Sequence, residues 1–116
     1  MTMCVIVNVA SFAGICVPPR EAIYAASKAA TNKVTQALAS VLVADNVNVN
    51  CIAPGAFESE MMDGMLERMG DITAGFPRKR LGKASQLDGT LLYLVSPSSD
   101  FVTGATIRVH DAQGAR

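Results

Sequence analysis

The sequence has no excess of charge, no paired cysteines and no long hydrophobic run, and each absence excludes a class of protein. Its 116 residues include ten Lys and Arg and ten Asp and Glu, so the formal net charge is zero. A basic field for phosphate backbones is therefore missing, and we expect no nucleic-acid partner. The three cysteines, Cys4, Cys16 and Cys51, form no C-x-x-C pair. This pattern argues against a disulfide framework or a metal site and fits a reducing cytoplasm.

Membrane insertion and secretion are also not expected. No segment approaches the ~20 apolar residues that span a bilayer. The apolar residues 1–17 have no Lys or Arg before Arg20, and Asn8 interrupts them, so they lack the pattern of a signal peptide. Half of the residues are hydrophobic and 17% are charged, which predicts a packed core. We expect a soluble, cytoplasmic protein of one small domain with no membrane contact.

The first half of the chain predicts two strands joined by a helix. Residues 4–10 are β-branched with almost no polar alternation, as in a strand buried on both faces of a parallel sheet. A loop through Gly14 and the pair Pro18-Pro19 leads to a helix over residues 21–44, which contain neither Gly nor Pro. A second β-branched strand follows within residues 46–55 and is stopped by its final Pro-Gly pair.

The second half predicts two helices, residues 58–69 and 85–95, and a short strand, residues 106–110. The order β-α-β-α-α-β indicates parallel strands with helical crossovers, the doubly wound α/β class. With only three strands, the apolar run at residues 5–9 risks lying at an exposed sheet edge, which promotes aggregation or requires a partner. The chain is therefore expected to be part of a larger sheet.

Tyr24 and Lys28 stand four residues apart, which places both on one face of the predicted helix near its N-terminus. A free tyrosine ionises only at about pH 10, but a neighbouring ammonium and a helix N-terminus both favour the phenolate. Such a pair can protonate a carbonyl oxygen or deprotonate an alcohol. A lone pair at this spacing more often lies on a solvated helix face, so further features must support the chemistry.

Two strand ends supply those features. Ser11 follows the first strand, and Pro54-Gly55 ends the second on the same side of the sheet, where open α/β sheets bind ligands. A serine hydroxyl there can hold a substrate oxygen beside the tyrosine, although serine after a strand is also a common turn residue. The Pro-Gly turn lets backbone N–H groups approach a ligand closely. Together, the three features predict one site.

The stretch "IVNVAS" ending at Ser11, then Tyr24 and Lys28, then "VNVNCIAPG" resembles the short-chain dehydrogenase/reductase family. The stretch "RLGKASQLDGTLLYLVSPSSDFVTGATIRV" also resembles that family, so the resemblance covers nearly the whole chain. It implies a Rossmann-type fold and hydride transfer between NAD or NADP and a carbonyl or alcohol substrate. The choice of nicotinamide cofactor stays open, as does the substrate: sugar, steroid and acyl-thioester carbonyls all fit.

The resemblance also implies residue roles. Tyr24 would be the acid/base, Lys28 would bind the nicotinamide ribose and favour the phenolate, and Ser11 would orient the substrate oxygen. The resemblance would also place four residues against the nicotinamide carboxamide: Pro54, Gly55, Phe57 through its backbone, and Ser59 through its hydroxyl.

The sequence departs from the family's pattern in its phosphate-binding part. Family members begin with a glycine-rich turn, G-x-x-x-G-x-G, that receives the cofactor pyrophosphate at a helix N-terminus. Here no two glycines are separated by a single residue, and the family's N-N-A-G segment and catalytic asparagine are also missing. We therefore expect residues 1–116 to be the C-terminal catalytic part, without the N-terminal dinucleotide-binding half. Cofactor binding should be weak and the isolated chain inactive or nearly so.

Three further features have less specific interpretations. Met61, Met62, Met65 and Met69 fall at helical spacing, where they either form a lid over a substrate or pack on the sheet. The cluster at residues 78–80 is expected to be a solvated loop. His110, which stands in a segment that is commonly acidic in the family, is interpreted as a structural variation.

The predicted helix at residues 21–44 is apolar on more than one side, so it can cover the sheet and also meet a second subunit. The resemblance implies a homo-oligomer through this helix. The sequence is compatible with two functions. One is the catalytic part of an oxidoreductase, and the other is a non-catalytic module that binds a partner through the helix and the strand edge.

Overall fold

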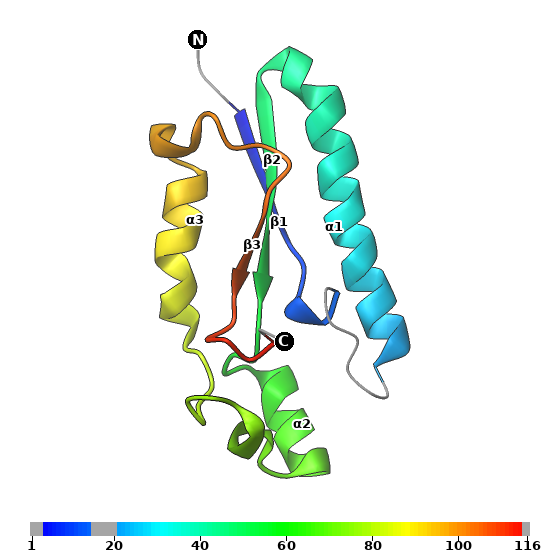
Figure 1. The fold of residues 1–116 in the computed structure, drawn as a ribbon, viewed down its shortest axis with the longest axis vertical. Coiled ribbons are helices and arrows are strands. Elements are labelled where there is room, and N and C mark those ends of the chain that lie inside the picture. The colour runs from blue at the N-terminus through cyan, green and yellow to red at the C-terminus, as the bar shows by residue number, and fades with distance from the viewer. Residues whose placement is uncertain (1–3, 15–20, 115–116) are drawn as a thin grey trace.

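A three-stranded parallel sheet between helices forms the centre of the molecule (Figure 1). The structure is a computed structural model, and it describes residues 4–14 and 21–114. The strands are β1 (Cys4–Val9), β2 (Val47–Pro54) and β3 (Thr106–Val109), in the order β1-β2-β3. The predicted α/β class with parallel strands is confirmed. Cys16 and the Pro18-Pro19 pair lie outside the described residues.

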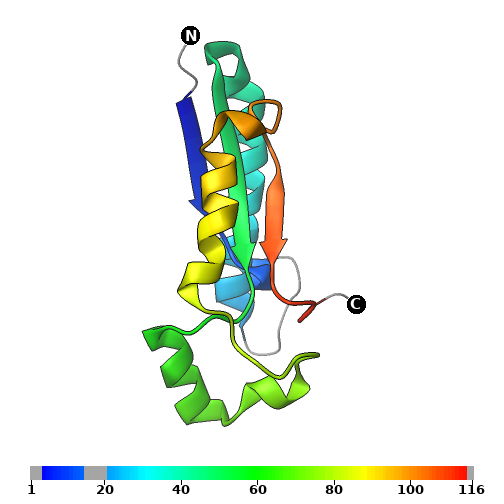
Figure 2. The same ribbon diagram turned by 90° about the vertical axis from the view of Figure 1, so that its left-hand side faces the viewer.

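The helices cover both faces of this sheet. Figure 2 shows α1 (Ala22–Leu42) behind the strands and α3 (Asp88–Leu94) in front of them, while α2 (Glu60–Met69) lies beyond the carboxyl ends of the strands. Among the described residues, no helix is both long enough and apolar enough to cross a membrane.

The central strand β2 is the buried part of the sheet. All its residues from Asn48 to Ala53 are buried, since it pairs with β1 on one side and β3 on the other. Two of these residues are polar, and both use their carboxamides on the segment before β3. Asn48 Nδ2 donates to Asp100 O and Asn50 Nδ2 donates to Val102 O, each at 2.9 Å. The alternating asparagines therefore fix how the chain enters β3.

The expectation that the first strand is buried on both faces is wrong. No residue of β1 is fully buried, and Ile6 and Val9 are 38% and 58% exposed. The reason is that β1 pairs only with β2, and no other strand among the described residues adjoins it. The edge position of β1 agrees with the other prediction, that a sheet of only three strands would leave this apolar strand at its edge.

The long helix α1 was predicted over residues 21–44, and the structure ends it at Leu42 with one further 3-10 turn at Val43–Asp45. Its sheet-facing side buries Ala25, Thr35 and Ala39. Asn8 Nδ2 of β1 donates to Thr35 Oγ1 at 3.0 Å, so the polar residue that interrupts the first apolar run is a link between strand and helix.

The other predicted helices are shorter in the structure. α2 begins at Glu60 because Ser59 is its N-cap. The helix predicted over residues 85–95 is a 3-10 turn at Ala84–Leu87 followed by α3, whose Leu94 is fully buried against the sheet.

Candidate active site

The carboxyl ends of the three strands meet at one edge of the sheet, because the strands are parallel. In Figure 1 the start of α1, the short turn Phe12–Gly14 after β1 and the chain leaving β2 all lie at this end of the molecule. Open α/β sheets bind ligands at this edge. Every site residue predicted from the sequence falls in one of these segments or in the first residues before α2.

Tyr24 and Lys28 share one face of α1, as their spacing predicts. Lys28 Nζ lies 5.7 Å from the centroid of the Tyr24 ring, within the range of a cation–π contact. Both side chains are half-buried. The charge of Lys28 also acts on the Cys51 thiol of β2, where it opposes the rise in pKa that burial causes. The lysine is therefore close to the tyrosine on the helix.

Ser11 is placed beside the same part of α1. Its Oγ accepts the backbone N–H of Ala13 at 3.1 Å, which shapes the turn after β1 and leaves the hydroxyl hydrogen able to donate. Gly14 packs so closely on α1 that a Cβ there would lie 2.7 Å from both Lys28 C and Ala29 N. The turn that carries Ser11 is thus fixed against the helix segment that carries Lys28.

The turn after β2 is largely engaged with the chain itself. Gly55 N–H donates to Val109 O at 2.8 Å, and Ala56 N–H donates to Gln113 Oε1 at 2.7 Å. Pro54 is the last residue of β2. Of the first three N–H groups after Pro54, only that of Phe57 makes no hydrogen bond to the part of the chain that the structure describes.

Ser59 is the N-cap residue of α2. Its Oγ accepts the Met62 N–H at 3.1 Å, which caps α2. Met62 is the buried methionine of this helix, whereas Met61 and Met69 are largely exposed. Met65 is half-buried, so the helix has one packed side and one exposed side. Both interpretations of the methionines stay predictions.

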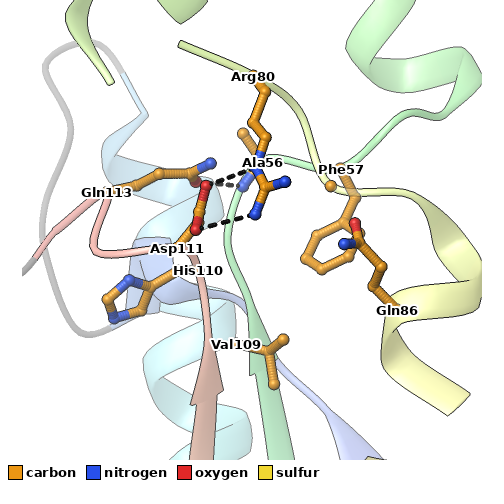
Figure 3. A pocket seen from close by; sticks show the side chains of 9 residues that line it. Ala56, Phe57, Arg80, Gln86, Val109, His110, Asp111 and Gln113 are labelled. Carbon is orange, nitrogen blue, oxygen red and sulfur yellow. Dashed lines mark hydrogen bonds and ion pairs between the residues drawn. The ribbon is translucent and has the colours of Figure 1, made fainter. Parts of the chain in front are cut away.

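A pocket that the sequence did not predict lies beside the turn after β2 (Figure 3). It has a volume of about 220 Å³, and its lining includes Ala56, Phe57, Arg80, Gln86, Val109 and Gln113. The ion pair of Arg80 and Asp111 forms part of the wall. Since these residues come from three distant segments, only the fold brings them together.

The cluster at residues 78–80, expected to be a solvated loop, is partly ion-paired. Arg80 binds both carboxylate oxygens of Asp111, with Nε–Oδ2 at 2.9 Å and Nη2–Oδ1 at 3.2 Å, and Arg78 Nη1 lies 3.4 Å from Oδ1. The hydrogen bond from Arg80 lowers the pKa of Asp111, and the carboxylate in turn raises the pKa of Arg80. No signal in the sequence pairs residues 31 apart across two loops.

His110 packs its ring against Phe12, with centroids 5.6 Å apart, so it joins the end of β3 to the turn after β1. His110 thus has a packing contact in the fold, and its interpretation as a structural variation stays a prediction. Among residues 4–14 and 21–114, no three His, Cys, Asp or Glu side chains are grouped as metal ligands would be.

Comparison with known proteins places this arrangement in a family. Residues 2–111 match a family model described as enoyl-(acyl carrier protein) reductase. Nodulation protein G of Rhizobium sp. (strain N33) is 35% identical over 106 residues, which are 90% of this chain and 43% of the relative. The 3-oxoacyl-[acyl-carrier-protein] reductase FabG of Thermotoga maritima is 36% identical over 105 residues, again 90% and 43%. The chain thus spans less than half the length of the curated relatives it matches.

Solved structures of similar proteins share this fold over most of the chain. A short-chain dehydrogenase/reductase from Brucella melitensis is 38% identical, with a TM-score of 0.82 over 92% of this chain and 44% of that one. A variant of actinorhodin polyketide ketoreductase with NADPH is 28% identical, with a TM-score of 0.91 over 98% and 48%. An NAD+-bound xylitol dehydrogenase is 29% identical, with a TM-score of 0.82 over 90% and 47%.

Proposed function

Because this chain belongs to the short-chain dehydrogenase/reductase family, we propose that it is the catalytic part of an NAD(P)-dependent oxidoreductase. Its reaction would interconvert a carbonyl and an alcohol, with Tyr24 as the acid/base. Relatives named for NADPH, NAD+ and a 3-oxoacyl thioester support this class of cofactor and substrate.

The observation that carries the proposal is the contact between Lys28 and Tyr24. The ammonium lies 5.7 Å from the ring centroid, on the first turns of α1. The contact places a cation beside the side chain that we propose as the acid/base of the reaction. Ser11 stands on a turn that is packed against the same helix segment.

In the proposed mechanism these residues handle the substrate oxygen and its proton. Ser11 Oγ donates a hydrogen bond to that oxygen and holds it beside Tyr24. Tyr24 donates its phenolic proton to the oxygen during reduction and takes a proton from the alcohol during oxidation. Lys28 keeps its positive charge beside the Tyr24 ring while the proton is exchanged. A bound nicotinamide supplies or receives the hydride.

The residues present fit one end of a nicotinamide cofactor. Lys28 has three N–H donors for ribose hydroxyls, and the N–H of Phe57 makes no hydrogen bond to the described residues, so it is available to a carboxamide oxygen. Pro54 and Gly55 form the turn that presents this group, and the Ser59 hydroxyl follows it. The pyrophosphate end has no matching glycine-rich turn in this sequence. We therefore propose that the 116-residue chain alone binds cofactor weakly and turns over slowly or not at all.

A chimera tests the proposed function. In it, this chain replaces the matching segment of the Thermotoga maritima reductase, and oxidation of NADPH or NADH by a 3-oxoacyl thioester is followed. We expect turnover that falls by roughly 10³-fold in Tyr24→Phe. The chain has two tyrosines, so Tyr93→Phe on α3 is a matched control that should keep turnover within about threefold. Equal turnover of the two variants would remove Tyr24 from the mechanism.

A partner-binding module is the second candidate, and the edge of β1, which no strand of the described residues pairs with, favours it. Ile6 and Val9 are exposed there, and α1 exposes Ile23, Val34 and Val41. Apolar strand edges pair readily with other chains. We propose homo-oligomer contacts through α1 and strand pairing at β1. Sedimentation should show association that Val34→Lys weakens at the helix and Val9→Lys at the strand, while a monomer at all concentrations would exclude both contacts.

A further inference from the structure

The four residues after β3, His110 to Gln113, contain features that cost free energy in the folded chain; we call them the latch segment. Asp111 and Ala112 have φ of 52° and 60°, the left-handed region that non-glycine residues rarely adopt. His110 Nδ1 is buried and has no hydrogen-bond partner in the described part of the chain. Strained backbone and unpaired buried atoms persist only where other contacts hold them, and they are concentrated at ligand clamps and switches.

Besides the Arg78 ion pair and the packing of His110 on Phe12, two side-chain contacts at the pocket hold the latch segment. Arg80 forms its two hydrogen bonds with the Asp111 carboxylate, and the Gln113 Oε1 accepts the Ala56 N–H at 2.7 Å. Figure 3 shows Gln113, Asp111 and His110 on one side of the pocket and Phe57 and Gln86 on the other, with Arg80 reaching Asp111. The latch segment is thus one wall of the pocket.

The position of Ala56 makes its N–H a binding group. It follows the carboxyl end of β2, where open α/β sheets bind ligands, and the next N–H, of Phe57, has no hydrogen-bond partner in residues 4–14 and 21–114. The group that now binds Ala56 is a side-chain carboxamide. A ligand carboxamide oxygen that accepts the Phe57 N–H, as proposed above, would lie next to the Ala56 N–H and accept it as well, so the ligand and Gln113 compete for this turn.

Gly55 allows this closed arrangement. A Cβ at Gly55 would lie 2.5 Å from Gln113 Oε1 and 2.6 Å from His110 Cβ. Any larger residue would therefore push the latch segment away from the turn.

We propose that the latch segment closes the turn after β2 by placing the Gln113 carboxamide on the Ala56 N–H, and that a ligand carboxamide binds this turn only after Gln113 leaves. The ligand class is a planar ring that carries a primary carboxamide, with the Phe57 ring beside it. This inference rests on the proposed function, in which that ring is the nicotinamide of the cofactor. The latch segment then regulates cofactor entry.

Opposite substitutions have opposite effects under this proposal. Gln113→Ala removes the competing carboxamide and favours the open state. Ala112→Gly relieves the backbone strain at φ 60° and favours the closed state. Gln36→Ala, an exposed glutamine of α1, is the matched control.

The test uses the whole 116-residue chain, labelled with ¹⁵N, and follows hydrogen exchange at the Ala56 amide before any ligand is added. Loss of one hydrogen bond should speed exchange about fivefold in Gln113→Ala, and Ala112→Gly should slow it by about twofold or more. Titration with nicotinamide mononucleotide should then give about fivefold tighter binding to Gln113→Ala, weaker binding to Ala112→Gly and no change in Gln36→Ala.

Ribose 5-phosphate, which lacks the carboxamide, is the control ligand, and its affinity should be the same in all variants. An equal gain for ribose 5-phosphate in Gln113→Ala would show anion binding at Arg78 and Arg80 and would overturn the proposal. So would unchanged Ala56 exchange, or no binding of nicotinamide mononucleotide to Gln113→Ala. The exchange measurement involves neither cofactor nor Tyr24. A negative result there would therefore refute the role of Gln113, whereas an inactive chimera would refute the proposed oxidoreductase function.

Discussion

The backbone N–H of Ala105 donates to Asn50 Oδ1 at 3.0 Å, across the sheet from β2 to the start of β3. The same carboxamide donates from Nδ2 to Val102 O. Asn50 is completely buried, so both ends of its side chain are paired inside the protein. One side chain thereby fixes the approach to β3 and, through β3, the position of the latch segment.

Asn50→Ala should destabilise the fold by about 2–3 kcal/mol, because it leaves the Ala105 N–H and the Val102 C=O without partners. Urea unfolding followed by circular dichroism measures the change. Gln36→Ala removes a carboxamide of similar size from the surface and should stay within about 0.5 kcal/mol. A loss below about 1 kcal/mol in Asn50→Ala would contradict a fixing role for this residue.

Gly14→Ala should destabilise the chain by about 1–3 kcal/mol, because the new Cβ would meet the backbone of Lys28 and Ala29 at 2.7 Å and backbone cannot rotate away. In the chimera it should also lower turnover, since it moves the turn of Ser11 away from α1. Gly89→Ala is the matched control: a Cβ there meets nothing within 4 Å, and α3 should gain about 0.5–1 kcal/mol. Equal effects of the two substitutions on unfolding would show that Gly14 is not closely packed.

Stability should fall as the pH rises from about 8 to 10, in part through Cys51. Burial raises the pKa of the Cys51 thiol, so the folded chain keeps a proton that the unfolded chain releases at about pH 8.5–9. The protonated Cys51 thiol therefore adds its full contribution to the free energy of unfolding below that range, and this contribution is lost as the pH rises above it. Urea unfolding at pH 8 and pH 10 should show a smaller loss in Cys51→Ala than in the parent chain. Cys4→Ala, at an exposed cysteine, should keep the full loss, and identical losses in all three proteins would exclude Cys51 as the cause.

The order of the elements could be predicted from local patterns. Residues 21–44 contain no helix breaker, and the structure has a helix from Ala22 to Leu42 with a short turn after it. The spacing of Tyr24 and Lys28 was sufficient to predict their shared face, because the helical repeat alone sets it. Helix starts were less accurate, since Ser59 fixes the start of α2 through a hydrogen bond that composition does not specify.

Burial and long-range pairing could not be predicted in the same way. The apolar residues of β1 indicated a strand covered on both faces, but burial depends on neighbouring strands, and β1 has only β2 beside it in the described structure. The arginines at positions 78 and 80 indicated a solvated loop, because the carboxylate they bind lies more than thirty positions away in the chain.

The sequence by itself determined the parallel α/β class, the helix that carries Tyr24 and Lys28, the placement of Ser11 after the first strand, and the end of the second strand at Pro54-Gly55. Each of these follows from short-range periodicity or turn chemistry. Only the tertiary structure decided which N–H groups of the turn after β2 are already bonded, and that Gln113 is the residue that bonds one of them. The physical reason is that parallel strands bring the ends of β2 and β3 together, so residues 57 apart in the chain become hydrogen-bond partners.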